Sequence, residues 1–265
     1  MPMVTTRAGQ VAFQETGSGP PLLLLHATLH DRHDFDVIVP ELSKHHRVIA
    51  LDWPGHGDSG LVQAGTVLGA PLLADALEDF VEALDLGNFS VIGSSVGGYA
   101  AAHFAALHPD RVEALVLVNC GGFTRMNLMA RCFCAAMGVP WLNRLVMPSF
   151  IRSYMKAQSE NDRAVTNRAL KRACSVEGTM TAAALWRSFA DPRHDLTRLA
   201  PLIKARTLII WGDWDTAIPL RDGHRANRLI SQSSLHRMPT GHVPFSSRPD
   251  DFLCLVLPWI SKSHH

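Results

Sequence analysis

The stretch Phe89–Ala101, which reads F-S-V-I-G-S-S-V-G-G-Y-A-A, constrains the fold of this chain more than any other. A short apolar run enters a cluster of glycine and serine, and a helix-compatible run leaves it, which predicts a strand, a tight turn and a helix. Only Ser95 has glycine two residues before it and two after it, at Gly93 and Gly97; Ser94 does not. Small residues at these positions let two backbones approach closely. We therefore expect the turn to project the Ser95 hydroxyl into a cleft.

Apolar runs and amphipathic stretches alternate on both sides of this turn. The expected strands are Val11–Glu15, Pro21–His26, Arg47–Leu51, Phe89–Gly93, Val112–Asn119, Thr207–Trp211 and Ser234–Met238. The helices expected in the α/β part of the chain cover Phe35–Leu42, Leu73–Leu84, 96–108, Leu220–Ile230 and Asp250–Ile260. Strands separated by helices predict an α/β fold, with a mostly parallel sheet covered by helices on both faces.

The pattern changes between Gly121 and Pro201, where the sequence predicts only helices. These are expected at Met126–Met137, Pro148–Lys156, Asp162–Cys174 and Met180–Phe189. The predicted organisation is one α/β domain, formed by residues 1–120 and 202–265, that is interrupted by a helical insertion at 121–201.

Composition excludes several classes of partner. The formal charge is +1 and the pI is near 7.8, so nothing indicates nucleic acid or an acidic membrane as a partner. No basic and apolar leader or membrane-length apolar run is present in the sequence. The five cysteines are interpreted as buried small hydrophobes in a reducing compartment, because they are odd in number and lack C-x-x-C spacing. The expected location is cytoplasmic, and the expected partner is a small-molecule substrate; the oligomeric state stays open.

Two further polar turns follow strands in the second half of the chain. One contains Asp213 and Asp215 after the strand at Trp211, and the other contains His242 after Met238. Ligands of open α/β sheets bind at the carboxyl ends of the strands, so Ser95 is expected to meet these residues at one edge.

The chain resembles the α/β-hydrolases over nearly its whole length. The motifs that carry the resemblance are L-L-L-L-H-A (22–27), D-W-P-G-H-G-D-S (52–59), G-S-S-V-G-G (93–98), W-G-D-W-D-x-x-x-P (211–219) and G-H-x-P-F (241–245). In such enzymes the G-x-S-x-G turn is the nucleophile elbow, and the residues follow in the order Ser, Asp, His. The resemblance implies an α/β-hydrolase fold in which the insertion 121–201 is a helical cap over the active site.

The resemblance also implies a catalytic triad of Ser95, His242 and Asp215. Asp215 is the fourth residue of G-x-x-D and is the expected acid, with Asp213 as the alternative. Neutral serine is a weak nucleophile, so His242 would accept its proton, while the carboxylate orients the imidazole. A serine at position 95 argues against relatives that need a carboxylate nucleophile there, the haloalkane dehalogenases and epoxide hydrolases.

Backbone N–H groups would stabilise the oxyanion. The expected donors are Val96 and Thr28. The family usually has His-Gly where this chain has His26-Ala27, and Ala27 itself is an alternative second donor.

Methionine and tryptophan are concentrated in the predicted cap, which favours an adaptable apolar pocket wall. The candidate wall residues are Met126, Met137, Trp141 and Trp186. No arginine or lysine can be singled out as a carboxylate or coenzyme clamp, and no cofactor or metal site is expected.

These features predict a serine hydrolase that cleaves a small or medium, largely apolar carboxylic ester, lactone or thioester. Two alternatives stay open at this point. One is hydrolysis of a carbon–carbon bond in a diketone with a similar triad, and the other is a ligand sensor of the same fold with little turnover.

Overall fold

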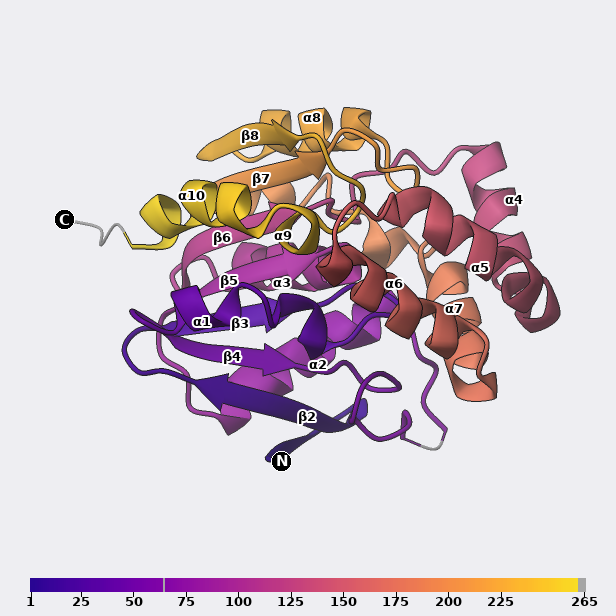
Figure 1. The fold of residues 1–265 in the computed structure, drawn as a ribbon, viewed down its shortest axis with the longest axis horizontal. Helices are drawn as coiled ribbons and strands as arrows, with labels where there is room; N and C mark the ends of the chain where they lie inside the picture. Colours follow the sequence, from indigo (N-terminus) through magenta and orange to yellow (C-terminus); the bar gives the residue numbers. More distant parts are fainter. Residues whose placement is uncertain (64, 262–265) are drawn as a thin grey trace.

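A computed structural model describes residues 1–63 and 65–261 and contains one eight-stranded sheet, in the order β1-β2-β4-β3-β5-β6-β7-β8 (Figure 1). The strands are β1 (Met3–Thr6), β2 (Gly9–Thr16), β3 (Pro21–Leu25), β4 (Arg47–Leu51), β5 (Phe89–Ser94), β6 (Val112–Val118), β7 (Arg206–Gly212) and β8 (Ser233–Met238). Pairing is antiparallel from β1 to β2 and from β2 to β4, and parallel between all other neighbours. The predicted α/β fold with a mostly parallel sheet is confirmed.

The central strands are apolar along their length because both of their faces are buried. In β3, Leu23 and Leu25 belong to one hydrophobic cluster, while Leu22 and Leu24 belong to the other. The period of two in a strand therefore distributes a continuous leucine run between the two layers of helices.

Helices cover both faces of the sheet. The layer on one face contains α1 (Val39–Leu42) and α10 (Pro249–Ile260), and that on the other contains α2 (Ala70–Ala83), α3 (Val96–Leu107) and α8 (Leu220–Leu229) (Figure 1). Short 3₁₀ segments lie at η1 (Arg32–Phe35), η2 (Pro192–His194) and η3 (Ala200–Leu202), and α9 (Pro244–Ser247) is a single turn. None of the helices among the described residues has the length and apolar character that a membrane span requires.

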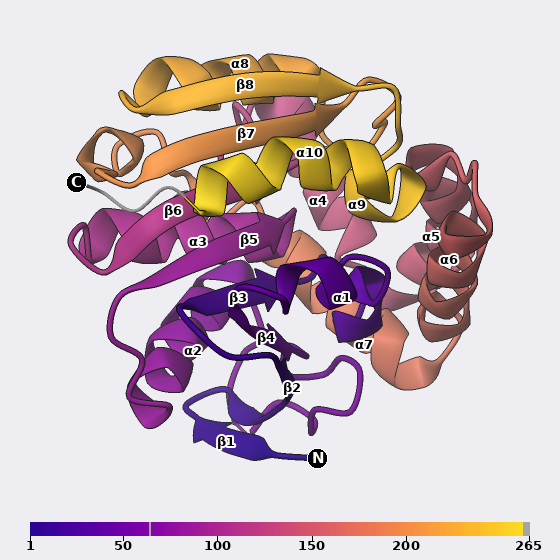
Figure 2. The same ribbon diagram turned by 60° about the vertical axis from the view of Figure 1, so that its left-hand side comes forward.

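The segment 121–201 forms a helical group beyond the carboxyl ends of the parallel strands (Figures 1 and 2). Its helices are α4 (Leu128–Met137), α5 (Pro140–Met155), α6 (Glu160–Ala173) and α7 (Val176–Ser188). Inner side chains such as Met147, Ile151 and Val165 join the hydrophobic cluster of the α1/α10 face. The group therefore packs on the edge of the sheet where the polar turns emerge.

Several boundaries differ from the sequence-based expectation. Helix α5 begins at Pro140 and continues through Pro148, although proline favours the first turn of a helix and Pro148 was therefore expected to start one. The edge strand β1 was not predicted, because its burial alternates over only four residues. The stretch expected as a helix at Phe35–Leu42 is divided into η1 and α1.

The interpretation that all five cysteines are buried is wrong for three of them. All five are free, but only Cys120 and Cys134 are buried, whereas Cys132, Cys174 and Cys254 are exposed. Cys132 lies on α4, Cys254 on α10 and Cys174 directly after α6, so apolar sequence neighbours alone did not establish their burial.

Candidate active site

The turn between β5 and α3 holds Ser95 in an unusual backbone conformation. Its φ is 53° and its ψ is −112°, a region that residues with a side chain rarely adopt. A Cβ at Gly93 would lie 2.5 Å from the carbonyl oxygen of Gly97, so the close approach requires glycine. Ser94 is buried, whereas Ser95 is partly exposed and lines an internal cavity. The turn therefore presents the hydroxyl of Ser95, and not that of Ser94, to the cavity.

His242 and Asp215 meet at the same edge of the sheet. The Nδ1 atom of His242 lies 2.7 Å from Oδ2 of Asp215, and both side chains are buried. The other carboxylate oxygen of Asp215 accepts a hydrogen bond of 2.7 Å from the backbone N–H of Ala217. The carboxylate is thus held from both sides, and it orients the His242 ring with Nε2 left available.

Asp213 has a different partner. Its carboxylate accepts a hydrogen bond of 2.6 Å from Nε of Arg237, a residue of β8 whose side chain is exposed. The structure therefore brings Asp215, rather than the alternative Asp213, into contact with His242.

Two residues that the sequence reasoning missed position His242. Asn119, directly after β6, donates 2.8 Å to the carbonyl of His242 and accepts 2.9 Å from the N–H of Gly212. The backbone carbonyl of Tyr154, at the end of α5, accepts from the backbone N–H of His242 at 2.9 Å, and the Tyr154 ring packs edge-on against the imidazole with 5.1 Å between the ring centroids. A polar residue at the end of a strand was a possible signal for Asn119, but no local signal marks Tyr154.

The loop after β3 brings the expected oxyanion donors to the cavity. Ala27, Thr28 and Val96 all line it. His26 connects this loop to the turn after β4, because its Nε2 accepts a hydrogen bond of 2.9 Å from the backbone N–H of Trp53. Nε2 of His56 accepts 3.1 Å from the N–H of Leu29.

These two histidines have structural positions. Burial lowers the pKa of His26 and that of His56 well below the usual value, so both rings are neutral at neutral pH. Neutral rings match their role as hydrogen-bond acceptors for backbone N–H groups.

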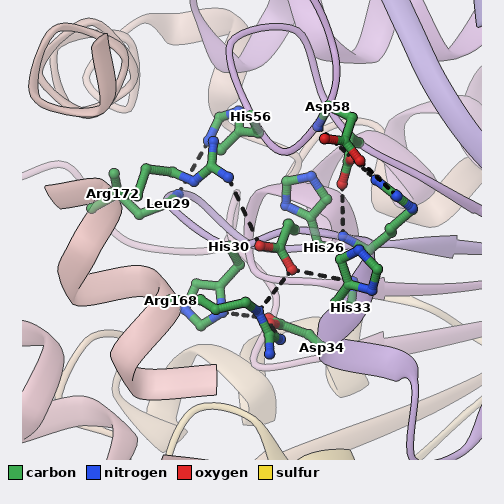
Figure 3. A network of polar contacts seen from close by, with 12 residues as sticks. His26, Leu29, His30, His33, Asp34, His56, Asp58, Arg168 and Arg172 are labelled. Carbon is green, nitrogen blue, oxygen red and sulfur yellow. Dashed lines mark hydrogen bonds and ion pairs between the residues drawn. The ribbon is translucent and has the colours of Figure 1, made fainter. Parts of the chain in front are cut away.

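Charged side chains connect the same loop to helix α6 (Figure 3). Arg168 lies 3.1 Å from Oδ1 of Asp31 and 2.8 Å from Oδ1 of Asp34. Asp34 also contacts Nδ1 of the buried His30, whose Nε2 lies 3.2 Å from the Tyr154 hydroxyl. The network connects the loop after β3 to both α5 and α6.

The cavity has a volume of about 160 Å³ and a mainly apolar lining, in which Phe133, Phe150, Trp186 and Phe189 form an aromatic wall. Trp186 is at its centre, with ring contacts to Phe133, Phe150 and Phe189 at 5.3, 5.7 and 5.4 Å. The lining also includes Gly121, Thr124, Met126, Ala130, Cys134, Met147, Tyr154, His194, Ala217, Ile218 and His242. An apolar group next to Ser95 would be enclosed by side chains from α4, α5 and α7.

The four predicted wall residues have different positions. Met126 and Trp186 line the cavity. Met137 does not, because it is only 2% exposed and packs in the core of the helical group. Trp141 is 70% exposed on the outer surface of α5. Apolar character alone could not separate the wall from the core and the surface.

No group of three or more His, Cys, Asp or Glu side chains within residues 1–63 and 65–261 is arranged to hold a metal ion. The expectation of a reaction without metal or cofactor stays a prediction.

Comparison with known proteins agrees with this architecture. The model of the alpha/beta hydrolase fold family matches residues 20–249. A 2-hydroxy-6-oxononadienedioate/2-hydroxy-6-oxononatrienedioate hydrolase of Pseudomonas putida is 31% identical over 240 residues, which cover 84% of this chain and 80% of the relative.

Two further proteins are similar over most of their length. A pimeloyl-[acyl-carrier protein] methyl ester esterase of Neisseria meningitidis is 28% identical over 244 residues, covering 88% of this chain and 90% of the relative. The structure of a thermophilic esterase from Thermogutta terrifontis superposes with a TM-score of 0.82 and 26% identity, covering 100% of this chain and 99% of the other. The chain therefore belongs to the α/β-hydrolase family of hydrolases.

Proposed function

We propose that this protein is a serine hydrolase that cleaves a small or medium, largely apolar carboxylic ester, lactone or thioester through an acyl-enzyme. The observation that carries the proposal is the joint position of three residues. Ser95, strained at the β5–α3 turn, and His242 line one apolar cavity, and the His242 ring is held by Asp215 at 2.7 Å. This arrangement combines a nucleophile, a base and a residue that orients the base.

Each residue has a defined task in the reaction. His242 accepts the Ser95 proton through Nε2 as the serine oxygen attacks the carbonyl carbon, and it then protonates the leaving alcohol or thiol. Water attacks the acyl-serine in the second half, with His242 again as the base. Asp215 keeps the Nδ1–H tautomer and stabilises the imidazolium.

The negative charge that develops on the carbonyl oxygen needs donors beside Ser95. We assign this role to the backbone N–H of Val96 and to that of Thr28 or Ala27, since all three residues line the cavity. The aromatic wall around Trp186 would enclose the apolar acyl group and exclude water from it.

Hydrolysis of a carbon–carbon bond is the second candidate. It is favoured by the 31% identical relative from Pseudomonas putida, whose name describes it as a hydrolase of a hydroxy-oxo dienedioate. Such substrates carry two carboxylates, whereas the aromatic wall beside Ser95 is apolar. The ester, lactone or thioester is therefore the preferred substrate class.

A covalent probe and a substrate panel test the proposal together. A fluorophosphonate should label Ser95 once per chain, and Ser95→Ala should abolish both labelling and turnover of p-nitrophenyl acetate and butyrate. Ser94→Ala is the matched control, because Ser94 is buried next to Ser95. Labelling that survives Ser95→Ala would contradict the proposal. Negligible turnover combined with ligand-dependent thermal stabilisation would indicate a ligand sensor.

A further inference from the structure

A second, larger hollow adjoins the cavity that contains Ser95. Its volume is about 1030 Å³, and it shares four lining residues with the cavity. These residues are Thr124, Met126, Phe189 and His194. The two hollows therefore lie side by side along this shared wall, and we call the larger one the arginine groove.

Five arginines line the arginine groove, and they come from separate parts of the chain. Arg125 precedes α4 and Arg131 lies on it. Arg198 lies between η2 and η3, and Arg225 and Arg228 lie on α8. None of the five forms an ion pair with a carboxylate in the part of the chain that the structure describes.

The acidic residues of the arginine groove do not compensate this charge. Asp191 is paired with Arg193 at 2.9 Å, outside the lining. Asp195 is the other lining carboxylate and accepts 2.9 Å from the N–H of Thr197. Arg225 donates 2.8 Å to the carbonyl of Phe123, which anchors that side chain. The arginine groove therefore has a net positive charge although the whole chain is near neutral.

The junction between the two hollows contains an unsatisfied polar atom. His194 is only 7% exposed, and its Nε2 has no hydrogen-bond partner among the described residues. Burial lowers the pKa of His194 to about 4, so its ring is neutral, and it also hydrogen-bonds the Phe189 backbone. A neutral ring that donates from its other nitrogen to a carbonyl leaves Nε2 as an acceptor for an N–H or O–H. Buried polar atoms in folded proteins almost always have a partner.

We propose that the arginine groove binds the phosphate groups of a phosphate-bearing thioester, such as a coenzyme A thioester, while its acyl group enters the aromatic cavity. This inference rests on the proposed function and specifies its substrate class. Guanidinium groups bind phosphate and carboxylate through paired N–H donors. The arginine groove has five guanidinium groups around a space several times larger than the cavity that contains Ser95. One carboxylate would require fewer cationic groups and less space. An amide N–H of the arm that links thioester and phosphates would satisfy Nε2 of His194 once the ring, which lines both hollows, turns this buried atom toward the ligand.

The chemistry balances with water as the only other reactant. The oxygen of Ser95 forms a bond to the thioester carbonyl carbon, the carbon–sulfur bond breaks, and the sulfur leaves as a thiol with the proton carried by His242. Water then cleaves the acyl-serine and releases the carboxylic acid, which restores Ser95.

Binding can be tested without turnover. The Ser95→Ala protein should bind free coenzyme A in calorimetry, and its affinity should fall as salt rises, because ion contacts with phosphate are screened. The double variant Arg125→Gln/Arg228→Gln, in the Ser95→Ala background, should weaken this binding about tenfold or more, since each charge-assisted hydrogen bond contributes substantially. Both arginines are exposed, and neither side chain forms a hydrogen bond or ion pair within the described residues, so the fold should tolerate their loss.

Arg163→Gln is the matched control. Arg163 is an exposed arginine on α6 that lines neither hollow, so its loss should change coenzyme A binding little. Absence of coenzyme A binding to the Ser95→Ala protein, or equal loss in the Arg163→Gln control, would overturn the assignment.

Kinetics separate this inference from the proposed function. The ratio of kcat/KM for butyryl-coenzyme A to that for the N-acetylcysteamine thioester of butyrate, which lacks phosphate, should be high. The Arg125→Gln/Arg228→Gln variant should lower that ratio about tenfold.

A ratio near one, with both thioesters hydrolysed through Ser95, would overturn the inference and leave the proposed function intact. A preference for half-esters of dicarboxylic acids, without coenzyme A binding, would overturn the inference and show that the arginine groove binds a carboxylate rather than a phosphate. If Ser95 is neither labelled nor required, the proposed function fails, and coenzyme A binding to Ser95→Ala still tests the groove.

Discussion

At the residue scale, the two candidate acids show how a short turn distributes its side chains. Asp213 and Asp215 are separated by one residue, yet one pairs with Arg237 on the surface and the other with the buried His242. The N–H of Ala217 holds the Asp215 carboxylate in the turn. The spacing in the sequence allowed either aspartate to be the partner of His242. The backbone path of the turn directs only Asp215 toward that histidine.

Asp215→Asn is expected to lower kcat by about 10⁴-fold, the loss measured for the equivalent change in a serine protease, because the amide stabilises the wrong His242 tautomer. Asp213→Asn removes a partly exposed ion pair and should change kcat little. Steady-state kinetics with p-nitrophenyl butyrate, together with melting curves to check folding, measures both effects. If the Asp213 variant suffers the larger loss, the acid is wrongly assigned.

At the element scale, the helices of the segment 121–201 contribute most of the cavity wall, and their packing determines which apolar residues face it. The same helix α4 places Phe133 on the cavity and Met137 in the core. Positions four residues apart lie on one face of a helix, but the neighbouring helices differ along its length. Amphipathic pattern therefore predicts burial without predicting which buried residues contact a ligand.

Trp186→Ala is expected to change kcat/KM unequally across acetate, butyrate and octanoate esters, by about 1 to 3 kcal/mol for each well-filled methylene contact that is lost. Fluorophosphonate labelling of Ser95 should persist, since Trp186 would contact the remote part of the acyl chain rather than the reacting carbonyl. Ester kinetics and labelling measure these effects.

Met137→Ala is the matched control for that experiment. Met137 is buried away from the cavity, so its truncation should reduce stability by about 2 to 5 kcal/mol and affect all three esters in equal proportion. A uniform change in the Trp186 variant, with a lower melting temperature, would remove Trp186 from the list of substrate contacts.

At the scale of the whole molecule, buried neutral histidines join the loops that cover the sheet edge. His26 and His56 accept backbone hydrogen bonds in the loop after β3, and His194 lies between the two hollows. Burial lowers the pKa of each ring in the folded state, whereas in the unfolded chain it returns to about 6.5. The unfolded chain therefore binds more protons than the folded one below that pH.

Stability is accordingly expected to be fully present above about pH 6.5 and to fall as the pH decreases. The free energy of unfolding, measured by urea titration, should therefore be lower at pH 5.5 than at pH 7.5. His56→Gln should make that decrease smaller, because the amide does not titrate and can still accept from the N–H of Leu29. Equal free energies at the two pH values would show that these rings are protonated without cost in the folded state.

The amino-acid sequence by itself determined the local parts of this protein. The G-x-S-x-G turn at Ser95, the apolar strands and the polar turns with Asp215 and His242 follow from backbone rules that act over a few residues. The order of strands and helices then placed these turns at one sheet edge, and the family resemblance agreed with it.

Only the tertiary structure decided which side chains surround that edge. Three sets of residues bring together distant parts of the sequence: Asn119 and Tyr154 beside His242, the aromatic wall, and the arginine groove. Asn119 and His242, for example, are 123 positions apart. No periodicity marks such sets, because their members lie on different helices and loops. Their proximity depends on how those elements pack, and packing is a property of the whole hydrophobic core rather than of any one segment.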